Sequence, residues 1–134
     1  MNAKILLCDD EPHIMRICQC KLQKAGMAVA LTNDGEEAWD ALQQELPDLL
    51  ISDFQMARLD GISLARRIYQ EPTMRHLPII LLTGKGLELK YDQCVQETGI
   101  RKVLSKPFSP KNLLSVVEEI LSSLIVESNG ESVV

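Results

Sequence analysis

The chain has 134 residues, of which 46% are hydrophobic and 25% are charged, and its net charge is -5. This length corresponds to about one domain with a core that needs no disulfide or metal, and the negative charge makes nucleic acid an unfavourable direct partner. Four cysteines form no CxxC pair, and no apolar run approaches membrane-spanning length. We therefore expect free thiols, no zinc site, no membrane contact and a cytoplasmic location.

Short apolar runs predict five buried strands. In chain order they are residues 4–8, 27–31, 49–52, 79–82 and 103–105. The runs are continuously apolar rather than alternating, which is typical of a parallel sheet that is covered by helices on both faces.

A helical segment is predicted after each strand. In chain order these segments are residues 12–24, 36–46, 62–70, 87–98 and 111–124. Alternating strands and helices with right-handed connections favour an α/β, flavodoxin-like doubly wound fold, with a five-stranded parallel sheet of order 2-1-3-4-5 and five helices. We expect one domain over residues 1–125, followed by a flexible polar tail at residues 126–134.

Chemically capable side chains follow four of the predicted strands. They are Asp9 and Asp10 after the first, Asp53 after the third, Thr83 after the fourth and Lys106 after the fifth. The carboxyl ends of parallel strands meet at one edge of a sheet. In the predicted order the first and third strands are neighbours, so the three aspartates are expected in the crevice between them.

Clustered carboxylates limit the chemistry that this edge can perform. Their mutual repulsion requires a proton, a cation or a nearby lysine, and oxygen ligands select hard cations such as Mg2+. An aspartate can also act as a nucleophile and carry a phosphoryl group, while Thr83 and Lys106 offer donors to phosphoryl oxygens. Each side chain alone also fits a structural role, such as a helix cap for Asp10, but their common placement favours a phosphoryl-acceptor site.

The chain resembles the receiver domain of bacterial two-component response regulators, the stand-alone chemotaxis type included. Four segments carry the resemblance in order, and together they span about residues 4–124: ILLCDDEP, PDLLISDFQMARLDG, PIILLTGKG and VLSKPFSP. The resemblance implies that Asp53 is the phosphorylated aspartate. It also implies that Asp9, Asp10, Asp53 and the backbone carbonyl of Gln55 hold Mg2+.

The resemblance assigns the remaining residues to a switch. Thr83 would supply the hydroxyl that moves toward the phosphoryl group, and Lys106 would contact the phosphoryl oxygens. The peptide bond from Lys106 to Pro107 would be cis. The phosphoryl donor would be a sensor histidine kinase, a phosphotransfer protein or a small acyl phosphate. A downstream protein would bind the face formed by residues 87–98, 103–105 and 111–124. The chain itself would be a monomer or a weak phosphorylation-dependent dimer.

Three positions depart from the family pattern. Ala57 stands where proline is usual, Gly84 where alanine is frequent, and Val103 where an aromatic side chain is usual. In the family that aromatic residue changes between exposed and buried positions as the threonine moves. Valine can barely report the state by such a motion. The phosphorylation chemistry is therefore predicted more firmly than the way in which the state is passed to a partner protein.

Two alternatives remain open at this stage. Val103 motivates a receiver-like protein-binding module that works without phosphorylation. A small aspartyl-phosphate phosphatase is the other, although such enzymes carry a second acid two residues after the nucleophile, where this chain has Gln55. We expect a signalling domain without turnover of an external substrate.

Overall fold

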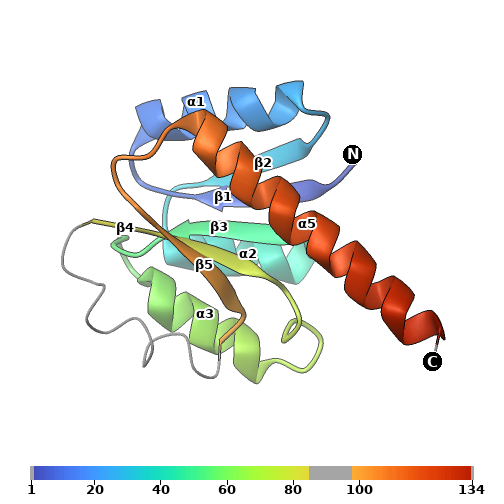
Figure 1. The fold of residues 1–134 in the computed structure, drawn as a ribbon. Helices are drawn as coiled ribbons and strands as arrows, with labels where there is room; N and C mark the ends of the chain where they lie inside the picture. The colour runs from blue at the N-terminus through green and yellow to red at the C-terminus, as the bar shows by residue number, and fades with distance from the viewer. Residues whose placement is uncertain (1, 85–97, 134) are drawn as a thin grey trace.

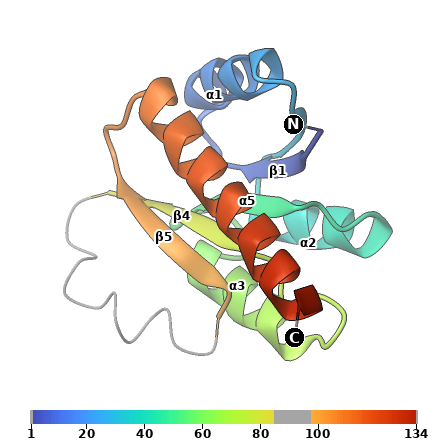
Figure 2. The same cartoon turned by 45° about the vertical axis from the view of Figure 1, so that its right-hand side comes forward.

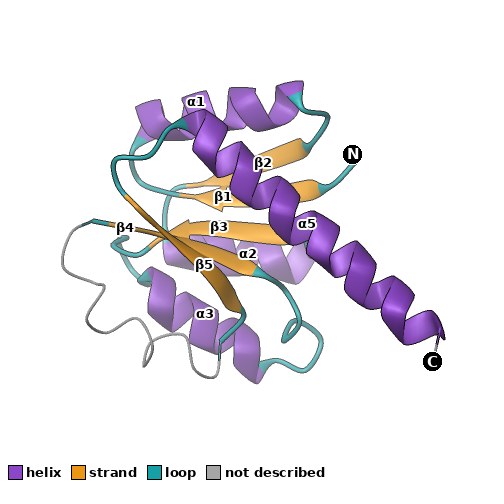
Figure 3. Ribbon diagram, viewed as in Figure 1, coloured by secondary structure: helices purple, strands orange, loops and turns teal. Residues whose placement is uncertain are grey.

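The computed structural model describes residues 2–84 and 98–133, with side chains described as far as Leu124. Within these residues a central sheet separates two layers of helices (Figures 1 and 3). No helix of the described residues is long and apolar enough to cross a membrane.

The sheet has the predicted strand order. Its strands are β1 (Lys4–Cys8), β2 (Ala28–Thr32), β3 (Leu49–Asp53), β4 (Ile79–Thr83) and β5 (Ile100–Ser105). They run parallel in the order β2-β1-β3-β4-β5. All residues of β3 and β4 are buried, as continuous apolar runs predict. β5 begins earlier than predicted, because exposed Arg101 and Lys102 interrupt its apolar pattern on an edge strand.

The described residues contain four helices. They are α1 (Pro12–Lys24), α2 (Gly35–Gln44), α3 (Gly61–Gln70) and α5 (Pro110–Val133). α1 has its predicted bounds and is followed by Gly26, whose φ of 95° is a conformation that favours glycine. α5 continues past the predicted helix end at Leu124 to Val133. The predicted helix at residues 87–98 lies, apart from its last residue, outside the described residues.

Two hydrophobic clusters join the helices to opposite faces of the sheet. α1 and α5 pack on the face that carries Ile5, Leu7 and Ile51, whereas α2 and α3 pack on the face that carries Leu6 and Leu50 (Figure 2). Successive side chains of a strand point to opposite faces, so neighbouring residues of one strand enter different clusters. This two-sided burial fixes the register of β1 and β3, and the register places the strand ends that carry the acidic residues.

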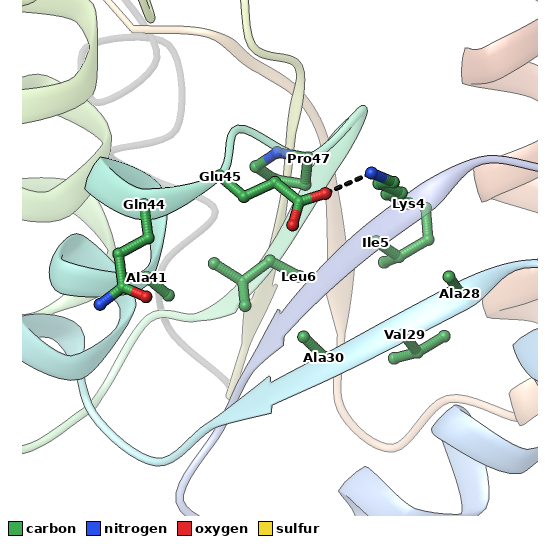
Figure 4. Close-up of a pocket in the computed structure, with 10 residues that line it drawn as sticks. All are labelled: Lys4, Ile5, Leu6, Ala28, Val29, Ala30, Ala41, Gln44, Glu45 and Pro47. Carbon is green, nitrogen blue, oxygen red and sulfur yellow. Dashed lines mark hydrogen bonds and ion pairs between the residues drawn. The ribbon is translucent and has the colours of Figure 1, made fainter.

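A groove of about 690 Å³ lies between α2 and the first half of β1 and β2 (Figure 4). Its floor includes Ala28 and Ala30, whose small side chains leave space under the helix, and an ion pair between Lys4 and Glu45 lies at its edge. Lys4 begins β1, whereas Asp9 follows the end of that strand. The groove is therefore at the end of the sheet opposite to the acidic residues.

Substitution of leucine by alanine should lower the free energy of unfolding much more at a buried position than at an exposed one. Leu50 is fully buried, and Leu50→Ala should lower the free energy of unfolding by about 2–5 kcal/mol through lost burial and a cavity. Leu46 is 44% exposed, and Leu46→Ala should change it by no more than about 0.5 kcal/mol. Urea unfolding followed by circular dichroism measures both free energies. Equal effects would contradict the burial of Leu50 in the core.

Candidate functional site

Four carboxylates meet where β1 and β3 end. Cys8 pairs with Ser52 in the parallel register, so the residues that follow them, Asp9 and Asp53, are brought together. One carboxylate oxygen from each of Asp9, Asp10, Glu11 and Asp53 lies within 4.8 Å of the others. The three predicted aspartates are thus assembled as expected. Glu11 is an addition that sequence reasoning did not assign to the site.

Lys106 lies against these carboxylates from the end of β5. Its Nζ is 3.3 Å from Asp9 Oδ2, 3.3 Å from Asp53 Oδ1 and 2.8 Å from Glu11 Oε1. Its backbone N–H donates to the carbonyl oxygen of Thr83 at 2.7 Å, which ties the end of β5 to the end of β4. The bond from Lys106 to Pro107 is cis, as the resemblance implies. The described structure therefore brings an ammonium into the predicted acidic crevice.

Burial dominates the electrostatics of the two innermost acids. Burial, followed by the charge of Asp9, raises the pKa of Asp53 against the opposing effect of Lys106, and the result is a pKa of about 6. Burial also raises the pKa of Asp9, against a hydrogen bond from the Glu11 backbone N–H and the charge of Lys106. Burial alone would lower the pKa of Lys106, but the hydrogen bond to Glu11 and the charges of Asp9 and Asp53 raise it.

The acidic cluster has the chemistry of a hard-cation site. Its donors are carboxylate oxygens, which Mg2+ prefers, and the four carboxylates exceed the single neighbouring ammonium in charge. Asp9 and Asp53 are buried while Asp10 is exposed, so the cluster combines fixed ligands with access from solvent. Gln55 lies exposed in the loop after β3, and the role of its backbone carbonyl stays a prediction.

Thr83 is the last residue of β4 and is 1% exposed. Asp53 pairs with Leu82 in the sheet, so Thr83 lies one position beyond the partner of Asp53. Phe54, directly after Asp53, donates its N–H to the carbonyl oxygen of Leu82 at 2.7 Å. The end of β4 is thereby hydrogen-bonded on one side to the segment after Asp53 and on the other side to Lys106.

Close backbone packing positions the loop that follows Asp53. A Cβ atom on Gly61 would lie 2.4 Å from the carbonyl oxygen of Asp53, so only glycine allows α3 to begin this close to β3. The N–H of Gly61 donates to the carbonyl oxygen of Phe54 at 2.8 Å. The first residues of the loop are therefore held between the sheet and the start of α3.

An ion pair joins the same loop to α2. Arg58, with a φ of 69°, places its guanidinium 3.1 Å from Asp34, and Asp34 also accepts a hydrogen bond from the N–H of Glu37 as the N-cap of α2. A Cβ on Gly35 would lie 2.0 Å from the carbonyl oxygen of Leu59, so the two segments touch through backbone. Sequence reasoning did not predict this contact, because nothing in a turn motif specifies what packs on it.

Val103 lies in β5 and is partly buried against the cluster that α2 and α3 share with the sheet. On the same strand Arg101 and Lys102 are exposed. The predicted output face thus has a described edge formed by β5 and α5. Its third component, residues 87–98, lies outside the described residues apart from Thr98.

Comparisons with known proteins agree on one family. A family model described as response regulator receiver domain matches residues 5–118. The chain is 38% identical over 122 residues to the alkaline phosphatase synthesis transcriptional regulatory protein PhoP of Bacillus subtilis, which covers 90% of this chain and 49% of that protein. It is 36% identical over 129 residues to the response regulator Rre1 of Synechocystis, with 96% of this chain and 55% of that protein covered. The chain thus spans about half the length of these curated relatives.

Solved structures show the same similarity. A putative response regulator from Chloroflexus aurantiacus aligns with a TM-score of 0.82 at 33% identity, over 91% of this chain and 99% of that chain. The chemotaxis response regulator CheY4 of Vibrio cholerae aligns with a TM-score of 0.81 at 28% identity, over 90% and 99% of the two chains.

Neutralising Asp53 should stabilise the fold at neutral pH. Because the folded state binds the Asp53 proton more tightly than the unfolded state, stability falls as pH rises from about 4 through 6. Without divalent cations, Asp53→Asn should raise the free energy of unfolding at pH 7 by about 1–2 kcal/mol, with solvent screening included, and should have little effect at pH 4. Urea titrations at both pH values measure this, with exposed Asp40→Asn as the control. A destabilised Asp53→Asn at pH 7 would contradict the described electrostatics.

Proposed function

The chain belongs to the response regulator receiver domain family of two-component signalling, and from this premise we propose that Asp53 accepts a phosphoryl group in an Mg2+-dependent reaction. The observation that carries the proposal is the placement of Asp53. It is buried at the end of β3, 3.3 Å from the ammonium of Lys106 and in one cluster of carboxylates with Asp9. A receiver-like module that works without phosphorylation is not favoured, because the acids and the lysine are already assembled.

The transfer step forms an acyl phosphate. A carboxylate oxygen of Asp53 attacks phosphorus, and the bond from phosphorus to the donor breaks. The donor keeps the bonding electrons and leaves as a histidine imidazole or, for a small acyl phosphate, as a carboxylate. With a pKa of about 6, Asp53 is mainly ionised at pH 7 and has a lone pair available for this attack.

Asp9, Asp10 and Asp53, with the backbone carbonyl of Gln55, would hold the cation. Bound Mg2+ would neutralise charge on the phosphoryl oxygens as they approach the carboxylates. The contribution of the protein is to fix these oxygens at strand ends and to supply further donors. Lys106 would donate to one phosphoryl oxygen and the hydroxyl of Thr83 to another.

Phosphorylation would act as a switch because it offers contacts that the resting state lacks. Thr83 and Lys106 would gain phosphoryl partners only after transfer, and this difference shifts an existing equilibrium between arrangements of the adjoining segments. Since the N–H of Lys106 is bonded to the carbonyl of Thr83, the two responses would be mechanically linked.

We propose that the response is read by another protein. On the β5–α5 side the chain exposes Arg101, Lys102 and Lys111, a basic set on a chain whose net charge is -5. An acidic partner surface would complement it. PhoP of Bacillus subtilis, which this chain matches over 49% of its length, is named as a transcriptional regulatory protein.

Incubation with acetyl phosphate and Mg2+ should add one phosphoryl group, of about 80 Da, to the wild-type chain. The adduct should be lost with EDTA in the reaction and in Asp53→Asn, and it should persist in Asp40→Asn, which removes an exposed acid of α2. Intact-mass spectrometry measures all four samples. An adduct that survives Asp53→Asn would overturn the assignment.

Mg2+ should stabilise the unphosphorylated protein through the same acids. At a concentration near 100 times the dissociation constant, binding to the folded state alone adds about 2.7 kcal/mol to the free energy of unfolding. This gain should appear for the wild type and be largely lost in Asp9→Asn and Asp53→Asn. Thermal unfolding with and without Mg2+ measures it. Equal stabilisation of Asp9→Asn would place the cation elsewhere.

A further inference from the structure

We propose that Glu11 is the counter-ion of Lys106 in the resting state and competes with the phosphoryl group for its ammonium, so that it slows phosphorylation of Asp53. Glu11 is thus a positioning residue, acting through Lys106. The proposal rests on the proposed function of Asp53, and the experiments below separate the two.

Glu11 makes the shortest of the three contacts of Lys106. The Oε1 atom of Glu11 lies 2.8 Å from Nζ, whereas the nearest oxygens of Asp9 and Asp53 lie at 3.3 Å. The Lys106 side chain is only 18% exposed, so its positive charge is stabilised mainly by these three carboxylates rather than by water. The ammonium therefore lies closer to Glu11 than to the residue that would be phosphorylated.

The local backbone leaves the Glu11 side chain available for this contact. Glu11 is the N-cap of α1, but its side chain makes no cap hydrogen bond. Its backbone N–H donates to Asp9 Oδ1 at 3.0 Å, which holds the start of α1 against the cluster. The side chain is anchored at its base and reaches Lys106 with its carboxylate.

The Lys106 ammonium donates hydrogen bonds to Glu11 and Asp9 and forms an ion pair with Asp53 at 3.3 Å. A phosphoryl oxygen that binds this ammonium competes with these carboxylates for its three donors. Glu11 is the partner that loses least, because its side chain is 51% exposed and regains hydration, whereas those of Asp9 and Asp53 are 1% and 8% exposed. Its negative charge also opposes an approaching phosphoryl group until it moves away.

Two variants of Glu11 test the contact separately from the charge. Glu11→Gln keeps the length of the side chain and removes the charge, while Glu11→Asp keeps the charge on a side chain too short to reach Lys106. Both should phosphorylate with acetyl phosphate about two- to fivefold faster than the wild type at saturating Mg2+, the range expected for loss of a partly exposed ion pair. Glu118→Gln removes an exposed acid of α5 and should leave the rate unchanged.

Intact-mass time courses give these rates. Unchanged or slower phosphorylation of Glu11→Gln would overturn the proposal. So would a fast Glu11→Gln combined with a wild-type rate for Glu11→Asp, since the charge alone would then act. Glu11 also belongs to the group of acids able to hold a cation. A tenfold or greater loss of Mg2+ affinity in Glu11→Gln would make it a metal ligand and overturn the counter-ion role.

A second measurement needs no phosphoryl transfer. The NMR signal of the Lys106 ammonium, recorded without Mg2+ or donor, should shift in Glu11→Gln and in Glu11→Asp but not in Glu118→Gln. If wild-type Asp53 accepts no phosphoryl group while these shifts appear, the proposed function fails and the contact stands. Absence of the shifts overturns the contact itself.

Discussion

The ion pairs of Lys106 with two buried carboxylates are the interaction on which the rest of the site depends. Two unit charges about 4 Å apart repel by roughly 4 kcal/mol at an effective dielectric of 20, so Asp9 and Asp53 could not remain ionised side by side without a counter-charge. Lys106 supplies it from β5, with an Nζ–oxygen distance of 3.3 Å to each acid. The compensation is partial, because four carboxylates face one ammonium, and because burial, followed by the charge of Asp9, still raises the pKa of Asp53 to about 6. This residual excess of negative charge suits the site to a cation.

The fold holds these charges through backbone rather than through additional side chains. The N–H of Lys106 is bonded to the carbonyl of Thr83, and that of Phe54 to the carbonyl of Leu82, so the ends of three strands are linked in sequence. Gly61 brings α3 against the carbonyl of Asp53, at a distance that a Cβ atom would forbid. These backbone contacts leave side chains, above all Glu11 and Lys106, as the groups at the site that can exchange partners. Chemistry at the site can then change contacts without disturbing the sheet.

Val103 shows how an edge strand can serve two purposes. Its side chain packs partly against the core cluster on the α2 and α3 side, while Arg101 and Lys102 point to solvent from the same strand. A valine anchored in this way contributes to the packing of the sheet against the helices. Recognition on this side of the molecule would then depend on exposed basic residues of β5 and α5.

The sequence by itself determined the sheet and the main residues of the site. Continuous apolar runs at β3 and β4 can only be buried on both faces, and that requirement sets a parallel sheet whose carboxyl ends gather Asp9, Asp53 and Lys106. The start of β5 escaped this reasoning because Arg101 and Lys102 break the apolar pattern at an edge, where one side of a strand faces water. Tertiary structure alone decided the contacts between side chains distant in sequence, namely Glu11 with Lys106 and Arg58 with Asp34. The physical reason is that hydrophobic periodicity fixes which face of an element is buried, whereas the partner of a polar side chain depends on distances that exist only after the elements have packed.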